Sequence, residues 1–183
     1  VEFSDARIVS LLPRYPRSAD PENIPLAAYH RGRPPHVSMA DAFPLLICTQ
    51  ESLDDLNERL VKKGKDRVPM NRFRPNLVLK GVSEAFEEDY WKVLKITSND
   101  DKEITTIIHV ISGCPRCKMC CIDQETGNMS IEPCETLAEF REFGDQDEAY
   151  FGVYGVIQET KDRTIQVGDQ VEVLLEGEPE WEE

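Results

Sequence analysis

The chain has 183 residues, of which 40% are hydrophobic and 31% are charged, a composition typical of one globular domain with an apolar core. A formal net charge of −14 at pH 7 repels nucleic acids and anionic lipids, so neither is an expected partner. No apolar run approaches the roughly 20 residues that a membrane-spanning helix needs, so no membrane segment is expected.

Residues 1–37 are expected to form a lead-in, with a short strand at 6–12. Six prolines follow that strand within the lead-in, and they interrupt helices and remove backbone donors from any sheet. We expect one domain over 38–175. The remaining residues, 176–183, are an acidic tail that we expect to fray.

The domain is predicted to begin with a buried apolar strand at 43–49, followed directly by a helix. Ser52 is predicted as the helix N-cap, because two aspartates follow it in the first turn. Leucines then recur at helical spacing, and two lysines and Gly64 are expected to end the helix.

Further strands are predicted where β-branched and apolar residues dominate: 76–80, 90–96, 104–111, 151–157, 164–167 and 171–175. A short helix is expected over 136–143. The acidic run at 84–89 is expected to be a solvated loop rather than an acid–base pair. Many short strands with few helices predict a mainly β fold, a β-barrel with a few peripheral α-helices.

Four of the six cysteines lie within eight residues, at Cys114, Cys117, Cys120 and Cys121. A core-rich chain of this size does not need a disulfide framework, so reduced thiols in an intracellular compartment are expected. The spacing is compatible with three kinds of site: a zinc site that also uses Cys134, an iron–sulfur cluster, or a metal site with a single thiolate ligand.

The geometry of a strand argues against a cage of four thiolates. If a strand continues over 119–122, Cys117 and Cys121 share one face and Cys120 points to the other. Cys120 and Cys121 are then expected to be buried packing residues. Cys117 is the expected reactive thiol, because the neighbouring Arg116 is a cation that favours a thiolate.

A basic island follows the predicted helix, in an otherwise acidic chain. Its six cations are Lys62, Lys63, Lys65, Arg67, Arg72 and Arg74. Arginine binds phosphate through two donors, so the island is a candidate anion site, with Arg74 and the amide of Asn76 at its centre. The alternative for the lysines is a solvated helix C-terminus, and for Arg74 a solvated strand entrance.

Several motifs occur together in one order along the chain: 72–78 (RFRPNLV), 85–91 (AFEEDYW), and 114–117 (CPRC) followed by Asp123-x-x-Thr126-Gly127. Together with 43–46 (FPLL), 151–154 (FGVY) and 167–171 (VGDQV), they resemble the MOSC domain. This domain forms the C-terminal part of molybdenum cofactor sulfurases and also occurs in the mitochondrial amidoxime-reducing component. The resemblance covers about residues 38–175.

The resemblance implies a β-barrel that holds the molybdenum–pterin cofactor, Mo-molybdopterin, through one cysteine thiolate. That ligand falls on Cys117, which would be both the metal ligand and the catalytic thiol. The anion-binding arginine and a neighbouring asparagine fall on Arg74 and Asn76, and an aspartate before the first strand falls on Asp41. Arg116 is expected to give electrostatic support to the cofactor.

The resemblance also implies an enzymatic role. The residues after Cys117 look closer to the sulfurases, so sulfuration or transfer of the molybdenum cofactor is expected, in the cytoplasm rather than the mitochondrion. The alternatives are reduction of N-hydroxylated substrates at molybdenum, and a non-catalytic carrier or interaction module. The expected partners are the cofactor itself and either an upstream desulfurase domain of the pyridoxal-phosphate type or an electron-transfer protein.

Overall fold

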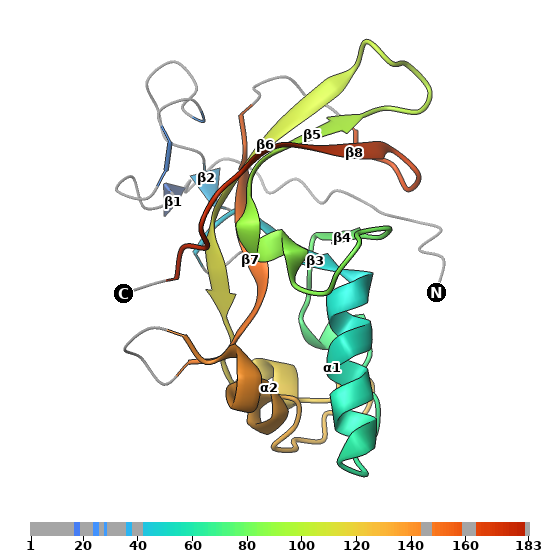
Figure 1. The fold of residues 1–183 in the computed structure, drawn as a ribbon, viewed down its shortest axis with the longest axis vertical. Coiled ribbons are helices and arrows are strands. Elements are labelled where there is room, and N and C mark those ends of the chain that lie inside the picture. Colours follow the sequence, from blue (N-terminus) through green and yellow to red (C-terminus); the bar gives the residue numbers. More distant parts are fainter. Residues whose placement is uncertain are drawn as a thin grey trace.

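A six-stranded sheet with two α-helices at one end makes up most of the described part of the chain (Figure 1). That part comprises residues 17–18, 24–25, 28, 36–37, 42–143, 148–158 and 164–181 of a computed structural model. In spatial order the strands are β4 (Leu77–Leu79), β3 (Leu45–Thr49), β7 (Tyr150–Ile157), β6 (Thr105–Pro115), β5 (Trp91–Thr97) and β8 (Gln170–Glu176). The other elements are α1 (Gln50–Lys62), α2 (Cys134–Arg141), the 3₁₀ helices η3 (Met70–Arg72), η4 (Glu87–Tyr90) and η5 (Lys118–Cys121), and a separate ladder of β1 (Arg17–Ser18) and β2 (His36–Val37).

The sheet curls into a half-barrel because β6 is long enough to pair with different strands along its length. Its first half pairs with β5 and its second half with β7, and the register shifts on either side of Gly113. Neighbouring strands are antiparallel except β3 and β4, which are parallel. Within the described residues the edge strands β4 and β8 do not pair with each other, so the half-barrel is open on that side. The predicted mainly β class with few helices is confirmed.

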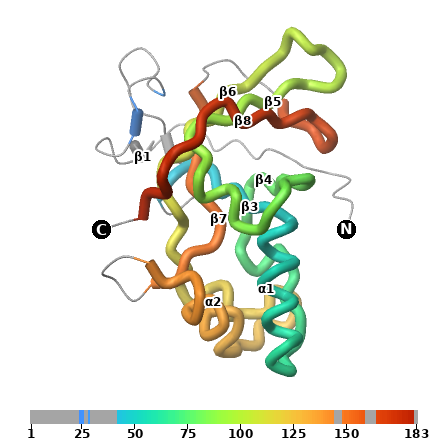
Figure 2. The backbone as a smooth tube through the Cα atoms, in the orientation of Figure 1, coloured from blue at the N-terminus to red at the C-terminus, as the bar shows by residue number. Residues whose placement is uncertain are grey.

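Side-chain alternation along β3 separates two apolar cores on the two faces of the sheet. Leu46 and Cys48 belong to a core that also contains the buried leucines of α1. Ile47 points to the other face, into the core of the half-barrel, with Trp91 and Leu94 of β5. Both helices therefore lie on one side of the sheet and at one end of it, while the β5–β6 hairpin extends at the opposite end (Figure 2).

Helix α1 forms where the leucine spacing predicts it, but its N-cap is Thr49 and not Ser52. The Thr49 hydroxyl accepts the Ser52 amide at 3.2 Å. Ser52 is one turn into the helix and buried, so the prediction for it is wrong by three residues. The helix ends as expected, with Lys63 as C-cap and Gly64 in the left-handed conformation at φ +72°.

The acidic run at 84–89 is not the solvated loop that was expected. Its second half is η4, and Glu88 and Asp89 are buried. Asp89 forms an ion pair of 2.7 Å with Arg141 of α2, which is also buried. Two carboxylates of the run thus lie in the core opposite specific partners, which a charge pattern alone does not reveal.

The predicted strand at 164–167, and the strand considered as a possibility at 119–122, are both absent from the described part of the chain. The segment at 119–122 forms η5 instead of a strand, so Cys120 and Cys121 do not alternate between faces and both are buried. The segment at 164–167 is a loop that leads into the turn before β8. In both segments apolar residues satisfy the strand pattern locally, but no strand ladder forms among the described residues, and Ile122 makes only an isolated bridge to Met129.

The acidic tail packs against the sheet as far as Trp181, so the expectation that it frays is wrong for 177–181. The Gly113 amide of β6 donates to the Glu180 carbonyl at 2.9 Å. The Trp181 ring stacks on Phe143 with the ring centroids 4.5 Å apart. One aromatic residue at the end of an acidic run is a weak signal, yet it anchors the segment.

Some sequence predictions fall outside the described residues, including the strand at 6–12 and almost all of the proline-rich lead-in. Within the described part, no helix is both long and apolar enough to cross a bilayer.

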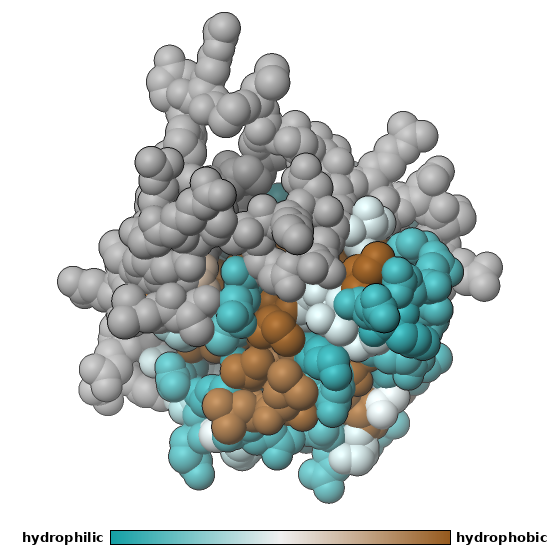
Figure 3. All heavy atoms as spheres, turned by 90° about the horizontal axis from the view of Figure 1, so that it is seen from above, coloured by the Kyte–Doolittle hydropathy of each residue, from teal (hydrophilic) through white to brown (hydrophobic). Residues whose placement is uncertain are grey.

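Side chains of β8 are exposed along most of the strand, among them Val171, Leu174 and Leu175. The face seen from above shows exposed apolar atoms among polar ones (Figure 3).

Candidate functional site

Cys117 lies where β6 leaves the sheet and η5 begins. It is exposed and occupies the position before the first residue of η5 in an extended conformation, with φ −80° and ψ 170°. Its carbonyl oxygen accepts hydrogen bonds from the Cys120 amide at 3.4 Å and from the Cys120 thiol at 3.3 Å. The backbone therefore fixes the loop and leaves the Cys117 thiol on the surface.

Arg116 ties this loop to the segment that carries Arg74. Its guanidinium donates through Nη1 to Cys114 Sγ at 2.9 Å and through Nη2 to the Phe73 carbonyl at 3.0 Å. It also lies over the Phe73 ring, 5.4 Å from the centroid. The guanidinium is thus directed at Cys114 rather than outward beside Cys117. Its hydrogen bonds join the two loops.

Arg72 also joins the same two loops. The sequence did not distinguish it from the other cations. It donates to the Cys120 carbonyl at 3.2 Å and forms a 3.3 Å ion pair with Asp123. Asp123 in turn accepts the Thr126 amide and hydroxyl, at 2.8 and 2.9 Å, which closes the turn after η5. The Asp-x-x-Thr-Gly part of the motif is therefore structural.

The basic island is mostly neutralised by acids. Ion pairs with carboxylates involve four of its cations: Lys62, Lys63, Lys65 and Arg72. Within the described residues no ion pair involves Arg67 or Arg74. A charge run in sequence predicts an anion site only where the folded chain leaves cations without partners, and Arg74 meets that condition.

Arg74 is exposed and has a left-handed backbone, with φ +58°. This conformation is uncommon for a residue other than glycine, and strain of this kind gathers at functional sites. Arg74 lines a cavity of about 1100 Å³ on the open side of the half-barrel, between β4 and the segment leading into β8. Asn76, Lys80 and Gln124 also line it and add polar groups to a wall that is otherwise largely apolar.

Asn76 has a clear structural role as well. Its side-chain oxygen accepts a hydrogen bond from the Leu46 backbone amide at 2.7 Å. The backbone amide of Asn76 donates to the Leu46 carbonyl oxygen at 2.8 Å. Asn76 thereby extends the pairing of β3 and β4 by one residue. The residue is exposed in the cavity wall, so the structure brings Arg74 and Asn76 to one place. Cys117 is not part of the cavity wall, and Asp41 lies outside the described residues.

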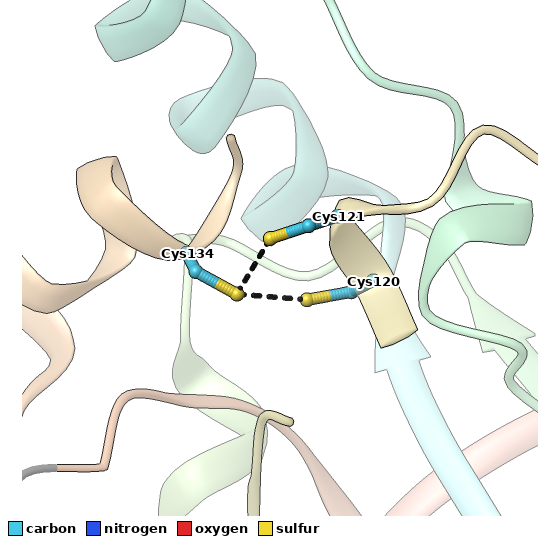
Figure 4. Close-up of side chains that lie close together, drawn as sticks. All are labelled: Cys120, Cys121 and Cys134. Carbon is cyan, nitrogen blue, oxygen red and sulfur yellow. Dashed lines mark hydrogen bonds between the residues drawn. The ribbon is translucent and has the colours of Figure 1, made fainter. Parts of the chain in front are cut away.

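Three other thiols form a cluster that strand alternation would have kept apart. Cys120 and Cys121 of η5 and Cys134 at the start of α2 point toward one another (Figure 4). The Cys121 and Cys134 sulfurs are 2.9 Å apart, and those of Cys120 and Cys134 are 3.4 Å apart. Hydrogen bonding from Cys134 lowers the pKa of Cys120 to about 6, against its burial and with help from Arg116. The sequence signal was a Cys-Cys pair with a third cysteine beyond a turn.

Comparison with known proteins places the chain in a family. The model of the MOSC domain matches residues 34–172. The chain is 38% identical over 142 residues to the human protein "Mitochondrial amidoxime reducing component 2", which covers 74% of this chain and 38% of that protein. The bovine protein of the same name is 36% identical over 147 residues, covering 76% and 40% respectively.

The chain is also similar to a fungal protein with a different name. "Molybdenum cofactor sulfurase" of Aspergillus terreus is 32% identical over 162 residues, which covers 82% of this chain and 18% of that protein. The chain thus spans less than half the length of each of these relatives. The family model covers most of the chain, and the chain belongs to the MOSC domain family.

Proposed function

We propose that this domain binds the molybdenum–pterin cofactor through the Cys117 thiolate and serves in sulfuration or transfer of that cofactor. The observation that carries the proposal is the exposed Cys117 thiol on a loop that hydrogen bonds join to the segment containing Arg74. The names of its relatives, amidoxime reducing component and molybdenum cofactor sulfurase, support the choice of cofactor.

The residues present fit a metal centre that takes a single protein ligand. Among the described residues, Cys117 belongs to no cluster of metal-ligating side chains, so it offers one thiolate and no cage. A soft thiolate suits molybdenum with oxo or sulfido ligands. When bound, the cofactor would supply a molybdenum centre at which oxo and sulfido ligands can be exchanged. The surface position of Cys117 leaves its thiol accessible to the cofactor.

Arg74 and Asn76 are proposed to hold the phosphate end of the pterin. Arg74 can donate two hydrogen bonds to phosphate, and no carboxylate among the described residues competes for it. The Asn76 oxygen is occupied by β3, which leaves its NH₂ group as the donor. Arg116 is proposed as a positioning residue, since its contacts join the two loops rather than reach outward.

The proposal is tested by cofactor loading. The protein would be expressed with a supply of molybdenum cofactor, and molybdenum and pterin would be measured per folded chain. We expect close to one of each for the wild type and loss of molybdenum in Cys117→Ser. Arg74→Gln should lose pterin occupancy about tenfold, the value of one charge-assisted contact. Arg67→Gln, which removes an exposed charge outside the cavity wall, is the matched control and should load normally.

Absence of molybdenum and pterin from folded wild-type protein would refute the proposal, as would loading that Cys117→Ser leaves unchanged. Circular dichroism of each variant separates loss of the site from loss of the fold. A sulfur-transfer assay with cofactor-loaded protein then tests the proposed role itself.

A second function is supported by the relatives named amidoxime reducing component, of which the human protein is 38% identical over 142 residues. In that case the same site reduces N-hydroxylated substrates, with electrons from a partner protein. Turnover of an amidoxime by loaded protein with a chemical electron donor would favour reduction, and its absence would exclude it. Both functions belong to an intracellular protein with reduced thiols, which is part of the proposal.

A further inference from the structure

The cluster of Cys120, Cys121 and Cys134 is the strongest site outside the proposed cofactor residues. Its three sulfur atoms all lie within 4.8 Å of one another, and Cys120 and Cys121 are buried. Cys134 is half-buried as the first residue of α2, so one of the three thiols is partly accessible to solvent while the other two are buried. The thiols come from elements about 13 residues apart, so tertiary packing has gathered them.

The sulfur positions are close to those that the coordination shell of a small soft ion requires. A tetrahedral zinc with bonds of about 2.3 Å places its sulfurs about 3.8 Å apart. The observed separations of 2.9 and 3.4 Å reach that value if the side chains move by less than about 1 Å. The carbonyl oxygens of Cys117 and Ile131, 3.3 and 3.4 Å from the nearest cluster sulfur, line the same space.

Charge selects the ion. Within the described residues no fourth cysteine, histidine or carboxylate joins the cluster, so the protein supplies three thiolates at most. With Zn²⁺ the complex carries one negative charge, which the neighbouring guanidinium of Arg116 balances. Cu⁺ would leave two negative charges in a buried place, which costs more. A water molecule on the Cys134 side can complete four-coordination.

We propose that Cys120, Cys121 and Cys134 bind one Zn²⁺ ion that fastens η5 to the start of α2. Binding replaces three S–H bonds by three Zn–S bonds and releases up to three protons. The ion sits beneath the Cys117 loop, because the Cys117 carbonyl contacts the Cys120 and Cys134 thiols at 3.3 and 3.9 Å. The site is separate from the proposed cofactor site, whose Cys117 thiol is outside the cluster.

The test is metal binding by the full chain, prepared under reductant and stripped with a chelator. Zn²⁺ would be titrated against a chromogenic chelator, with proton release measured in weak buffer, and Co²⁺ would serve as a spectroscopic probe for thiolate ligands. We expect one ion per chain, a thiolate-to-cobalt absorption band, and a higher Tm with Zn²⁺. Cys134→Ser should weaken binding by more than the 10- to 100-fold that loss of an outer-shell partner costs.

Cys134→Ser is the preferred variant because the half-buried helix start tolerates a hydroxyl, and Cys121→Ser is the second. Cys117→Ser is the matched control, a nearby thiol outside the cluster, and should bind Zn²⁺ like the wild type. Absence of binding by the wild type, binding that survives both cluster variants, or binding lost with Cys117 would overturn the proposal. So would a Cys121–Cys134 disulfide that persists under reductant. No molybdenum is needed, so the result is independent of the proposed function.

Discussion

At the scale of single residues, the carboxyl group of Glu88 carries more of the structure than its acidic surroundings suggest. It is fully buried, and its Oε2 accepts the hydroxyls of Thr49 at 2.9 Å and Ser52 at 2.8 Å. Among the described residues its Oε1 has no hydrogen-bond partner. Burial raises the pKa of Glu88 above 4.5, because no cation in contact offsets the loss of water.

Glu88→Gln is expected to make stability less dependent on pH. The folded protein holds the Glu88 proton to a higher pH than the unfolded chain, so stability from the protonated form is fully present below about pH 4.5 and is lost as pH rises through the folded pKa. The glutamine amide is neutral and its oxygen can still accept both hydroxyls. Urea unfolding from pH 5 to 8 should therefore show the wild type losing free energy of unfolding relative to the variant.

The difference between the two proteins isolates Glu88, because all other groups titrate in both. Equal pH dependence of the two unfolding free energies would contradict the prediction. Glu87→Gln serves as the control, since Glu87 is partly exposed and bonded to Ser83.

At the scale of elements, α1 shows how a cap is chosen by the fold as well as by the local pattern. Both Thr49 and Ser52 are good cap residues, but β3 runs directly into the helix and brings Thr49 to its start. The Thr49 hydroxyl then accepts the Ser52 amide and donates to Glu88 of η4. One hydroxyl thus joins a strand, a helix and a 3₁₀ helix.

Thr49→Ala is expected to lower the free energy of unfolding by about 2 kcal/mol, because it removes the cap and one bond to a buried carboxyl. Thr49→Ser keeps the hydroxyl and should lose clearly less. Chemical denaturation of the two variants measures the contrast. Equal losses would show that the methyl group, and not the cap, is what matters.

At the scale of the whole molecule, the C-terminal segment closes the end of the sheet near α2. Trp181 contacts Tyr150 of β7 and Phe143, with ring centroids 4.9 and 4.5 Å away. Gly113 makes this possible, since a Cβ there would lie 2.6 Å from the Trp181 ring. Residues nearly 70 positions apart are therefore fitted to each other.

Trp181→Ala is expected to destabilise the protein by about 2 kcal/mol, less than for a fully buried tryptophan. Gly113→Ala should have a similar effect by displacing the ring, and it should shift tryptophan fluorescence toward the red. Trp181→Phe, which keeps an aromatic ring, is the milder control. Unchanged fluorescence in Gly113→Ala would show that the ring does not pack on β6 in solution.

Much of the fold could be predicted because its signals are local. Leucines at helical spacing predicted α1, and runs of β-branched residues predicted β5, β6, β7 and β8 to within a few residues. The candidate site was less predictable. Arg74 and Cys117 were named from motifs. The hydrogen bond from Arg116 to Cys114 and the ion pair of Arg72 could be recognised only in the folded chain.

The mainly β class, the principal helix and the ordered motifs of the MOSC family could be read from the chain alone, because periodicity and motif order are properties of neighbouring residues. Which of several similar residues come into contact depends on the folded chain. It buried Glu88 and Asp89 within an acidic run, paired most of the basic island, seated Trp181 on Gly113 and brought Cys134 to Cys120 and Cys121. These outcomes depend on contacts between distant segments, and no local pattern specifies which distant segments pack together.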